Sequence, residues 1–176
     1  MNGVNLRLAS HTDIRRIAEM SRCLVEIGLT GWSWNPARVA AAVRHRESAV
    51  VVADVKRKLA GFAIGEFGDT RLHLSLLAVE PQRQRKGIGR ALVAWLEKSA
   101  LTMGISEMQL ELRTNNLAAR YFYESLGFTP LRNVPGYYRG EESALRMRKA
   151  IGALVVDTCD VKALLEKLSF RNKYLR

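Results

Sequence analysis

Two glycines stand at the start of a predicted helix, directly after a predicted strand. The strand covers Leu72 to Val79, and the segment from Gln84 to Gly89 (QRKGIG) leads from it into the helix. Glycine at such a point lets the backbone approach a ligand closely, and the unpaired N–H groups of a first helical turn attract anions. Arg85, Lys86 and Arg90 add positive charge. The segment is therefore a candidate phosphate site.

Two other phosphate motifs are excluded at this turn. A dinucleotide fingerprint needs a third glycine where Leu92 stands, and the sequence contains no Gly-Lys-Ser or Gly-Lys-Thr of a P-loop. What remains is a strand, the pattern Gln-x-x-Gly-x-Gly, and a helix.

A second group of polar residues follows, on a predicted strand and the helix after it. Side chains alternate along a strand, so Glu111 shares one face with Gln109 and Arg113, and such a polar face needs a cleft or a sheet edge. On the helix, Asn116 and Tyr123 are seven residues apart, so both side chains lie on one face, separated by ~10 Å of axis. A different face, which we expect to be the buried one, carries Ala118, Tyr121, Phe122 and Ser125.

These segments resemble the motifs of the GCN5-related N-acetyltransferase (GNAT) superfamily, and within it the N-terminal acetyltransferases, which include the bacterial ribosomal-protein alanine N-acetyltransferases. The resemblance covers about residues 5–149 and is strongest at Leu76 to Ala91, at Leu110 to Phe128 and at Tyr137-Tyr138. It implies an α/β domain over residues 1–150, with a mixed, mostly antiparallel sheet of six to seven strands and helices on both faces. Residues 151–176 would then be an extension with a short helix.

The resemblance also implies roles for individual positions. Acetyl-CoA would be the co-substrate, with Glu111 as general base and Tyr123 as general acid. The implied cofactor contacts are the backbone of Leu77, Ala78 and Val79 for the pantetheine arm, the turn Arg85, Lys86, Gly87, Ile88, Gly89 and Arg90 for the pyrophosphate, and Asn116. The implied acceptor-binding residues are Trp32, Trp34, Tyr137 and Tyr138. Gln84 stands where many relatives have Arg.

Acetyl transfer from a thioester to an amine needs a neutral amine, a stabilised oxyanion and a proton for the leaving thiolate. An α-amino group has a pKa of ~8 and a lysine of ~10.4, which favours a protein or peptide N-terminal amine as acceptor. Since the motifs contain no nucleophile, we expect direct attack in a ternary complex. A small-molecule amine, a lysine side chain and a non-catalytic CoA-binding role remain alternatives, and the presence of both Glu111 and Tyr123 argues against the last.

Composition limits the class of protein. The 176 residues, 48% hydrophobic and 26% charged, fit one globular domain, and the sequence predicts a cytoplasmic protein without a membrane segment, as a monomer or homodimer. The net charge of +11 favours anionic partners such as a phosphate-bearing cofactor or an acidic or ribosomal surface, with nucleic acid only incidental. His11, His45 and His73 lack the spacing of a metal site. Cys23 is expected to pack inside a helix face.

Hydrophobic periodicity and breaker residues predict the elements that position these side chains. The expected strands are Asn5 to Ala9, Ala49 to Val55, Leu59 to Phe67, Leu72 to Val79, Met108 to Leu112, one starting at Gly127, and Ala144 to Met147. The expected helices are Ile14 to Ile27, Pro36 to Arg46, Ile88 to about Gly104, and Asn116 to Leu126. A β-meander followed by alternating strands and helices predicts a mixed sheet.

Overall fold

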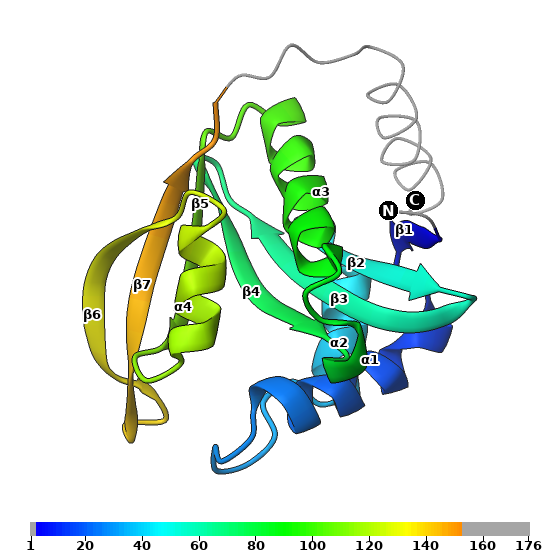
Figure 1. Cartoon of the computed structure of the whole chain (residues 1–176), viewed down its shortest axis with the longest axis horizontal. Coiled ribbons are helices and arrows are strands. Elements are labelled where there is room, and N and C mark those ends of the chain that lie inside the picture. The colour runs from blue at the N-terminus through cyan, green and yellow to red at the C-terminus, as the bar shows by residue number, and fades with distance from the viewer. Residues whose placement is uncertain (1–2, 153–176) are drawn as a thin grey trace.

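A seven-stranded sheet organises the computed structural model, which describes residues 3–152. The strands are β1 (Val4–Leu8), β2 (Ser48–Val55), β3 (Lys58–Phe67), β4 (Arg71–Val79), β5 (Glu107–Arg113), β6 (Thr129–Tyr138) and β7 (Glu142–Ala150). Their order across the sheet is β1-β2-β3-β4-β5-β7-β6 (Figure 1). β4 and β5 are parallel, and the other neighbouring pairs are antiparallel. The short helix predicted within residues 151–176 and the second cysteine, Cys159, lie outside the described residues.

Helices cover both faces of this sheet (Figure 1). In the described residues the α-helices are α1 (Ile14–Met20), α2 (Pro36–Arg44), α3 (Ile88–Thr102) and α4 (Leu117–Glu124), and the shorter turns are η1 (His11–Asp13), η2 (Ser21–Val25) and η3 (Pro81–Arg83). α3 and α4 lie on one face, and α1 and α2 lie on the other. The predicted fold class, a mixed and mostly antiparallel sheet with helices on both faces, is therefore confirmed. None of the helices in residues 3–152 has the length and apolar character needed to cross a membrane.

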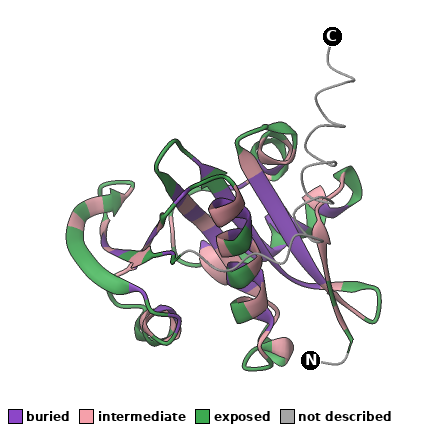
Figure 2. Ribbon diagram, turned by 90° about the horizontal axis from the view of Figure 1, so that it is seen from above, coloured by how far each residue is buried: buried purple, intermediate pink, exposed green. Residues whose placement is uncertain are grey.

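Two hydrophobic cores form because each layer of helices buries an apolar stripe against the sheet. On the α3 side, Leu92 and Leu96 pack with Met108 and Leu110 of β5. On the α1–α2 side, a separate cluster includes Phe62 of β3. The central strands are buried, whereas β6 is exposed along the outer edge of the sheet (Figure 2).

β4 changes the core into which it packs at Ser75. Consecutive residues of β3 pair with Leu74 and Leu76, so Ser75 is an additional residue in β4 and forms a β-bulge. As a result Leu74 packs in the α3 core and Leu76 in the α1–α2 core. Pairing with β5 ends at the same place, because Leu74 with Leu110 is the last pair. Beyond this point the two parallel strands separate and leave a gap in the sheet.

The first predicted helix is too long. We expected it to run from Ile14 to Ile27, but α1 ends at Met20 and continues as the π-helical turn η2. The wider turn accompanies a hydrogen bond from the Ser21 hydroxyl to the buried Glu26, and it takes the following residues out of the α-helical period. Cys23 is consequently exposed, so its predicted burial is wrong.

The predicted buried face of α4 is also wrong. Tyr121 is 65% exposed, whereas Tyr123 is only 8% exposed and belongs to the α3-side core. The face that carries Asn116 and Tyr123 is directed at the sheet, because the gap between β4 and β5 lies beneath it. Tyr123 therefore lies on the inner face of this helix, whereas Tyr121 lies on the outer face.

The paired tyrosines lie in a strand that begins at Thr129, two residues after the strand start predicted at Gly127. Tyr137 and Tyr138 are the last residues of β6, and the connection to β7 is shorter than predicted. The pairing of the two strands is irregular between Val134 and Tyr138. This irregularity lets the end of β6 bend toward the gap.

Candidate active site

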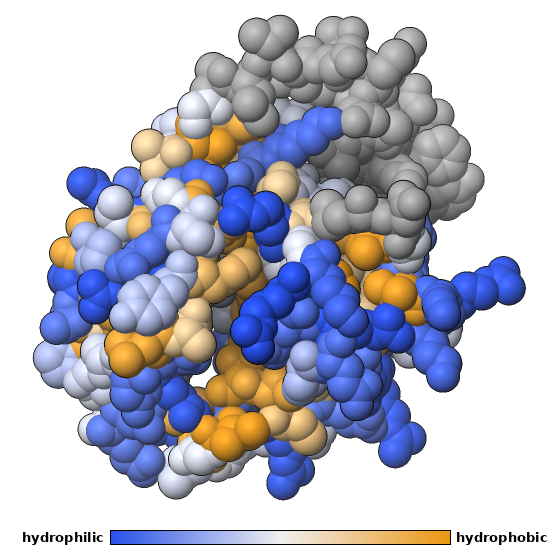
Figure 3. Space-filling model, viewed as in Figure 1, coloured by the Kyte–Doolittle hydropathy of each residue, from blue (hydrophilic) through white to orange (hydrophobic). Residues whose placement is uncertain are grey.

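A cavity of about 420 Å³ lies where β4 and β5 separate; we call it the central cavity. Its walls come from the α1–α2 connection (residues 24–34), β4, β5, α4 and the end of β6. The predicted site residues that line it are Trp34, Leu77, Glu111, Asn116, Tyr123, Tyr137 and Tyr138. Figure 3 shows apolar surface in the recess between α3 and α4, with hydrophilic side chains around it. The separation of two strands thus brings together residues far apart in the sequence.

The predicted phosphate turn leads from β4 into α3 and lies beside the gap (Figure 1). Arg85 and Gly87 have positive φ angles of 58° and 83°. Gly87 is the N-cap of α3, and no side chain caps this helix end. Arg85, Lys86 and Arg90 are exposed. The first-turn N–H groups of a 15-residue helix therefore lie next to three exposed cationic residues.

Gly89 is close to the neighbouring helix. A Cβ added at this position would lie 3.1 Å from Cζ of Phe122 on α4. Contacts of that length are tighter than normal packing, so the Phe122 ring would have to shift by a few tenths of an ångström to admit a larger residue. Gly89 therefore allows α3 and α4 to pack closely.

Beyond the bulge, β4 has a strand neighbour on one side only. Leu77, Ala78 and Val79 pair with β3, while the pairing with β5 stops before them. Backbone groups that face the gap are consequently available to a ligand. Leu77 lines the central cavity, whereas Ala78 is buried and belongs to the α1–α2 core.

Glu111 is bonded to three other side chains, and its own side chain is only 5% exposed. Its Oε2 atom lies 2.6 Å from Nε2 of His73 and accepts a hydrogen bond from the Tyr137 hydroxyl at 3.1 Å. Its Oε1 atom accepts from Nε of Arg146 at 2.5 Å. Arg146 is the residue directly opposite Glu111 on β7.

These partners determine the charge of the carboxyl group. Burial acts to raise the pKa of Glu111, but the hydrogen bonds and charges of His73 and Arg146 outweigh burial and lower the pKa to about 2. The predicted strand face is confirmed, because Met108 and Leu110 point into the α3-side core on the other face. Glu111 is thus an anion held on the α1–α2 side of the sheet.

Tyr123 lies on the other side of the gap, in an apolar environment. Its ring makes edge contacts with Phe122 and Phe128, with centroids 5.1 and 5.5 Å away. Burial, with a smaller contribution from Tyr138, raises the pKa of Tyr123 well above its ordinary value. The hydroxyl is therefore held in its protonated form while it borders the central cavity.

Asn116 is the N-cap of α4, and its Oδ1 atom accepts a hydrogen bond from the N–H of Ala119 at 3.0 Å. This cap fixes the start of the helix that carries Tyr123. Asn116 also borders the central cavity.

The α1–α2 connection is held by a buried carboxylate that the sequence analysis missed. Glu26 accepts hydrogen bonds from the N–H groups of Ser33 and Trp34 and from the Ser21 hydroxyl. Trp34 is consequently fixed in the wall of the central cavity, with the guanidinium of Arg38 4.2 Å from its ring centroid.

Trp32 is not brought into the same cavity. It lies in the wall of a separate cavity formed by the α1–α2 connection, with Arg22 above its ring. Tyr137 and Tyr138 do border the central cavity, and their rings are in edge contact at 5.0 Å. The central cavity is therefore lined by one of the two predicted tryptophans, Trp34, and by both predicted tyrosines.

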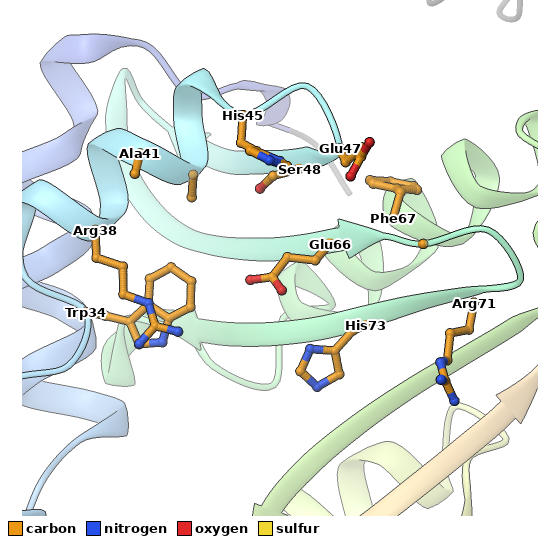
Figure 4. Close-up of a pocket in the computed structure, with 12 residues that line it drawn as sticks. Trp34, Arg38, Ala41, His45, Glu47, Ser48, Glu66, Phe67, Arg71 and His73 are labelled. Atoms are coloured by element: carbon orange, nitrogen blue, oxygen red, sulfur yellow. The ribbon is translucent and has the colours of Figure 1, made fainter.

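A side cavity of about 540 Å³ adjoins the central cavity between α2, β3 and β4 (Figure 4). Both cavities are lined by Trp34, Arg38, Glu66 and His73. Within the described residues, no group of three His, Cys, Asp or Glu side chains has the arrangement of a metal site.

Sequence reasoning also missed His73 and Arg146. Arg146 could have been found from the polar alternation of the last strand, where it follows Leu145 and precedes Met147. His73 carries no such signal, because its contact with Glu111 depends on the parallel pairing of β4 with β5. The cavity therefore combines a buried anion, a buried neutral phenol and unpaired strand backbone, a set suited to acid–base chemistry on a ligand between two strands.

Comparison with known proteins agrees with this arrangement. Residues 15–128 match the model of the acetyltransferase (GNAT) family. The [ribosomal protein bS18]-alanine N-acetyltransferase of Escherichia coli strain K12 is 39% identical over 93 residues, which cover 51% of this chain and 63% of that protein. The match therefore spans less than two thirds of this curated relative.

Solved structures extend the likeness to most of the chain. Ard1 from Thermoplasma volcanium superposes with a TM-score of 0.75 at 25% identity, over 85% of this chain and 99% of that one. The ribosomal-protein-S18-alanine N-acetyltransferase from Escherichia coli gives a TM-score of 0.70 at 26% identity, over 88% of this chain and 97% of that one. Because the family model matches residues 15–128, more than half of the 176 residues, this chain belongs to the GNAT acetyltransferase family.

Proposed function

We propose that this protein transfers an acetyl group from acetyl-CoA to a primary amine, the N-terminal α-amine of a protein or peptide. The observation that carries the proposal is the central cavity. There Tyr123 lies on one side of the gap, and Glu111 with its hydrogen-bonded partners, which we call the Glu111 centre, lies on the other. A neutral acid and an anionic centre with oppositely shifted pKa values are the pair that such a transfer needs.

Acetyl-CoA fits the elements around the gap. The free strand edge of Leu77 to Val79 offers backbone hydrogen bonds to the pantetheine amides. The uncapped start of α3, with Arg85 and Arg90 exposed beside it, offers N–H groups and positive charge to the pyrophosphate. Members of the GNAT family use acetyl-CoA, which supports this assignment.

The reaction we propose is direct attack within a ternary complex. The neutral amine attacks the thioester carbonyl carbon, and backbone N–H groups of β4 at the gap stabilise the oxyanion. The C–S bond then breaks, and the Tyr123 hydroxyl gives its proton to the thiolate. The amine loses its proton to the Glu111 centre on the α1–α2 side.

The acceptor side favours a peptide end over a free polyamine. Tyr137, Tyr138 and Trp34 form an aromatic rim where a peptide end can lie. Carboxylates at this rim are balanced by Arg38, Arg113 and other cations, so it is not an acidic pocket. The relative from Escherichia coli is named as an alanine N-acetyltransferase of a ribosomal protein. This name supports a protein acceptor, with ribosomal proteins among the candidates.

The test is acetylation of matched acceptors. The chain is incubated with acetyl-CoA and three panels: peptides with a free amino end and no lysine, peptides with a blocked amino end and one lysine, and small polyamines or aminoglycosides. Mass spectrometry should show a gain of one acetyl group in the first panel. Modification confined to either of the other panels would replace the proposed acceptor. If acetyl-CoA binds and none of the panels is modified, the chain is a CoA-binding module.

A further inference from the structure

His73 lies beside Glu111 and reaches both cavities. Its Nε2 atom is 2.6 Å from Oε2 of Glu111, and its Nδ1 atom is 3.2 Å from the Ser75 hydroxyl. The side chain is 34% exposed, while that of Glu111 is 5% exposed. Figure 4 shows the imidazole on β4 next to Glu66 of β3, at the edge of the side cavity. Of the two side chains, the imidazole is the more accessible to an incoming molecule.

The carboxylate of Glu111 is poorly placed to take a proton itself. Both of its oxygens already accept hydrogen bonds, one from Arg146 and the other from Tyr137 and His73. A proton that replaced any of these donors would leave a part-buried cation or hydroxyl without its partner. The geometry makes Glu111 an orienting group.

An ionised carboxylate only accepts hydrogen bonds, so Nε2 of His73 must carry the hydrogen that it shares with Glu111. In the neutral ring, Nδ1 then holds the lone pair. Ser75, the bulge residue of β4, is the hydroxyl beside that lone pair, and it lines the central cavity. The bulge thus leaves a basic nitrogen at the edge of the gap.

We propose that His73 is the group that takes the acceptor's proton, at Nδ1, and that Glu111 positions the ring. The inference rests on the proposed acetyl transfer and names its proton acceptor. As the amine nitrogen bonds to the carbonyl carbon, its proton passes to Nδ1, directly or through the Ser75 hydroxyl. The C–S bond breaks, Tyr123 protonates the thiolate, and the imidazolium returns its proton to the Tyr123 phenolate through solvent. Atoms and charge balance over the cycle.

The surroundings of His73 suit a transient positive charge. Charged or titratable groups line the same cavities from each neighbouring element: Glu66 on β3, Arg71 on β4, Glu111 on β5, Tyr137 on β6, and Arg38 and His45 on α2 or its end. Glu66 is the direct cross-strand partner of His73. The carboxylates of β3 and β5 therefore flank the ring and stabilise the imidazolium that forms.

Two variants distinguish a proton-accepting role of His73 from a purely structural role. In His73→Gln the side-chain amide can still donate to Glu111 but cannot act as a base. We expect kcat to fall by ~10²–10⁴, with the affinity for acetyl-CoA unchanged, and the low-pH limb of the kcat profile to disappear. In His73→Ala, added imidazoles of similar size should restore turnover in proportion to their basicity. The matched control is His45→Ala, which removes a histidine from the side cavity without touching Glu111.

A His73→Gln enzyme within about threefold of the wild-type kcat, with the same pH profile, would overturn the proposal and return the role to Glu111. Rescue that does not depend on the basicity of the imidazole would overturn it as well. Both results require a wild-type chain that acetylates peptides. If the wild type modifies no amine at all, the proposed function fails instead, so the two failures are distinguishable.

Discussion

The two sides of the gap both withdraw a reactive side chain from solvent, yet they shift the ionisation of these groups in opposite directions. Tyr123 on the α4 side is surrounded by aromatic rings, and no hydrogen bond joins its hydroxyl to another described residue. Glu111 on the α1–α2 side accepts hydrogen bonds from three side chains. Burial, with a smaller contribution from Tyr138, keeps the phenol protonated, whereas the hydrogen-bond partners of the carboxyl keep it ionised against the effect of its burial. Partners, and not depth, decide the charge of each group.

The largest expected effect comes from removing the Tyr123 hydroxyl, which supplies the proton on the α4 side of the gap. Tyr123→Phe keeps the ring and its contacts with Phe122 and Phe128, so the fold should be retained. We expect kcat to fall by ~10²–10⁴, with little change in acetyl-CoA affinity, in steady-state assays and calorimetry. Tyr121→Phe, on the exposed face of the same helix, is the matched control. Full turnover in Tyr123→Phe with chemistry as the slow step would exclude the acid role.

Low pH should reduce the contribution of Glu111 to the stability of the fold. The pKa of Glu111 in the folded protein, about 2, lies below its ordinary value of 4.5. A lowered pKa stabilises the fold above the ordinary value, and this stability is lost as the pH falls from about 4.5 toward 2. The difference in unfolding free energy between wild type and Glu111→Gln should be roughly 1–3 kcal/mol near pH 6 and should shrink through that range. A difference that stays constant with pH would contradict the assigned charge.

Removing one cationic partner should have a smaller effect on the same side. Arg146→Met leaves Glu111 with two of its three donors, and we expect a loss of about 1–2 kcal/mol in denaturant unfolding. Arg148→Met is the control, since Arg148 is half exposed and its ion pair with Glu107 spans 3.9 Å. Equal losses in the two variants would mean that the buried pair is no stronger than the exposed one.

The smallest effect should come from loosening the apolar enclosure of Tyr123. Phe128 is 2% exposed, and Phe128→Leu removes an aromatic contact while retaining a buried apolar side chain. We expect about 1 kcal/mol of destabilisation by thermal unfolding, and turnover close to wild type. Loss of turnover as severe as in Tyr123→Phe, with the fold intact, would show that the enclosure itself sets the acid's reactivity.

The sequence was sufficient for the parts of the site that are local in the chain. The turn from Gln84 to Gly89, the strand face of Glu111 and the start of the helix at Asn116 each follow from spacing within one or two elements. The mixed sheet with helices on both faces followed from the order of elements and from the family resemblance. These features depend on short-range backbone preferences.

The sequence was insufficient where the site depends on which strands become neighbours. His73 and Arg146 meet Glu111 only because β4, β5 and β7 are adjacent, and the crossover that makes β4 and β5 parallel leaves no local signal. The exposure of Cys23 depends on a π-helical turn that a period of 3.6 residues does not anticipate. The buried face of α4 was assigned to Tyr121 instead of Tyr123, because the gap beneath α4 was unknown. The errors at His73, Arg146 and α4 involve tertiary contacts that override the local pattern.

The short pairing between β4 and β5 has a mechanical consequence. Only four residue pairs, from Arg71 with Glu107 to Leu74 with Leu110, join the half-sheet β1–β4 to the half-sheet β5–β7–β6. A molecule that lies in the gap contacts both halves, so its binding stabilises the arrangement in which the two halves are adjacent. Backbone amides of β4 beyond Leu74 that face the gap should exchange rapidly with deuterated water when the gap is open, and slowly once it is filled. A bound ligand would therefore hold the two half-sheets together and raise the free energy needed to separate them.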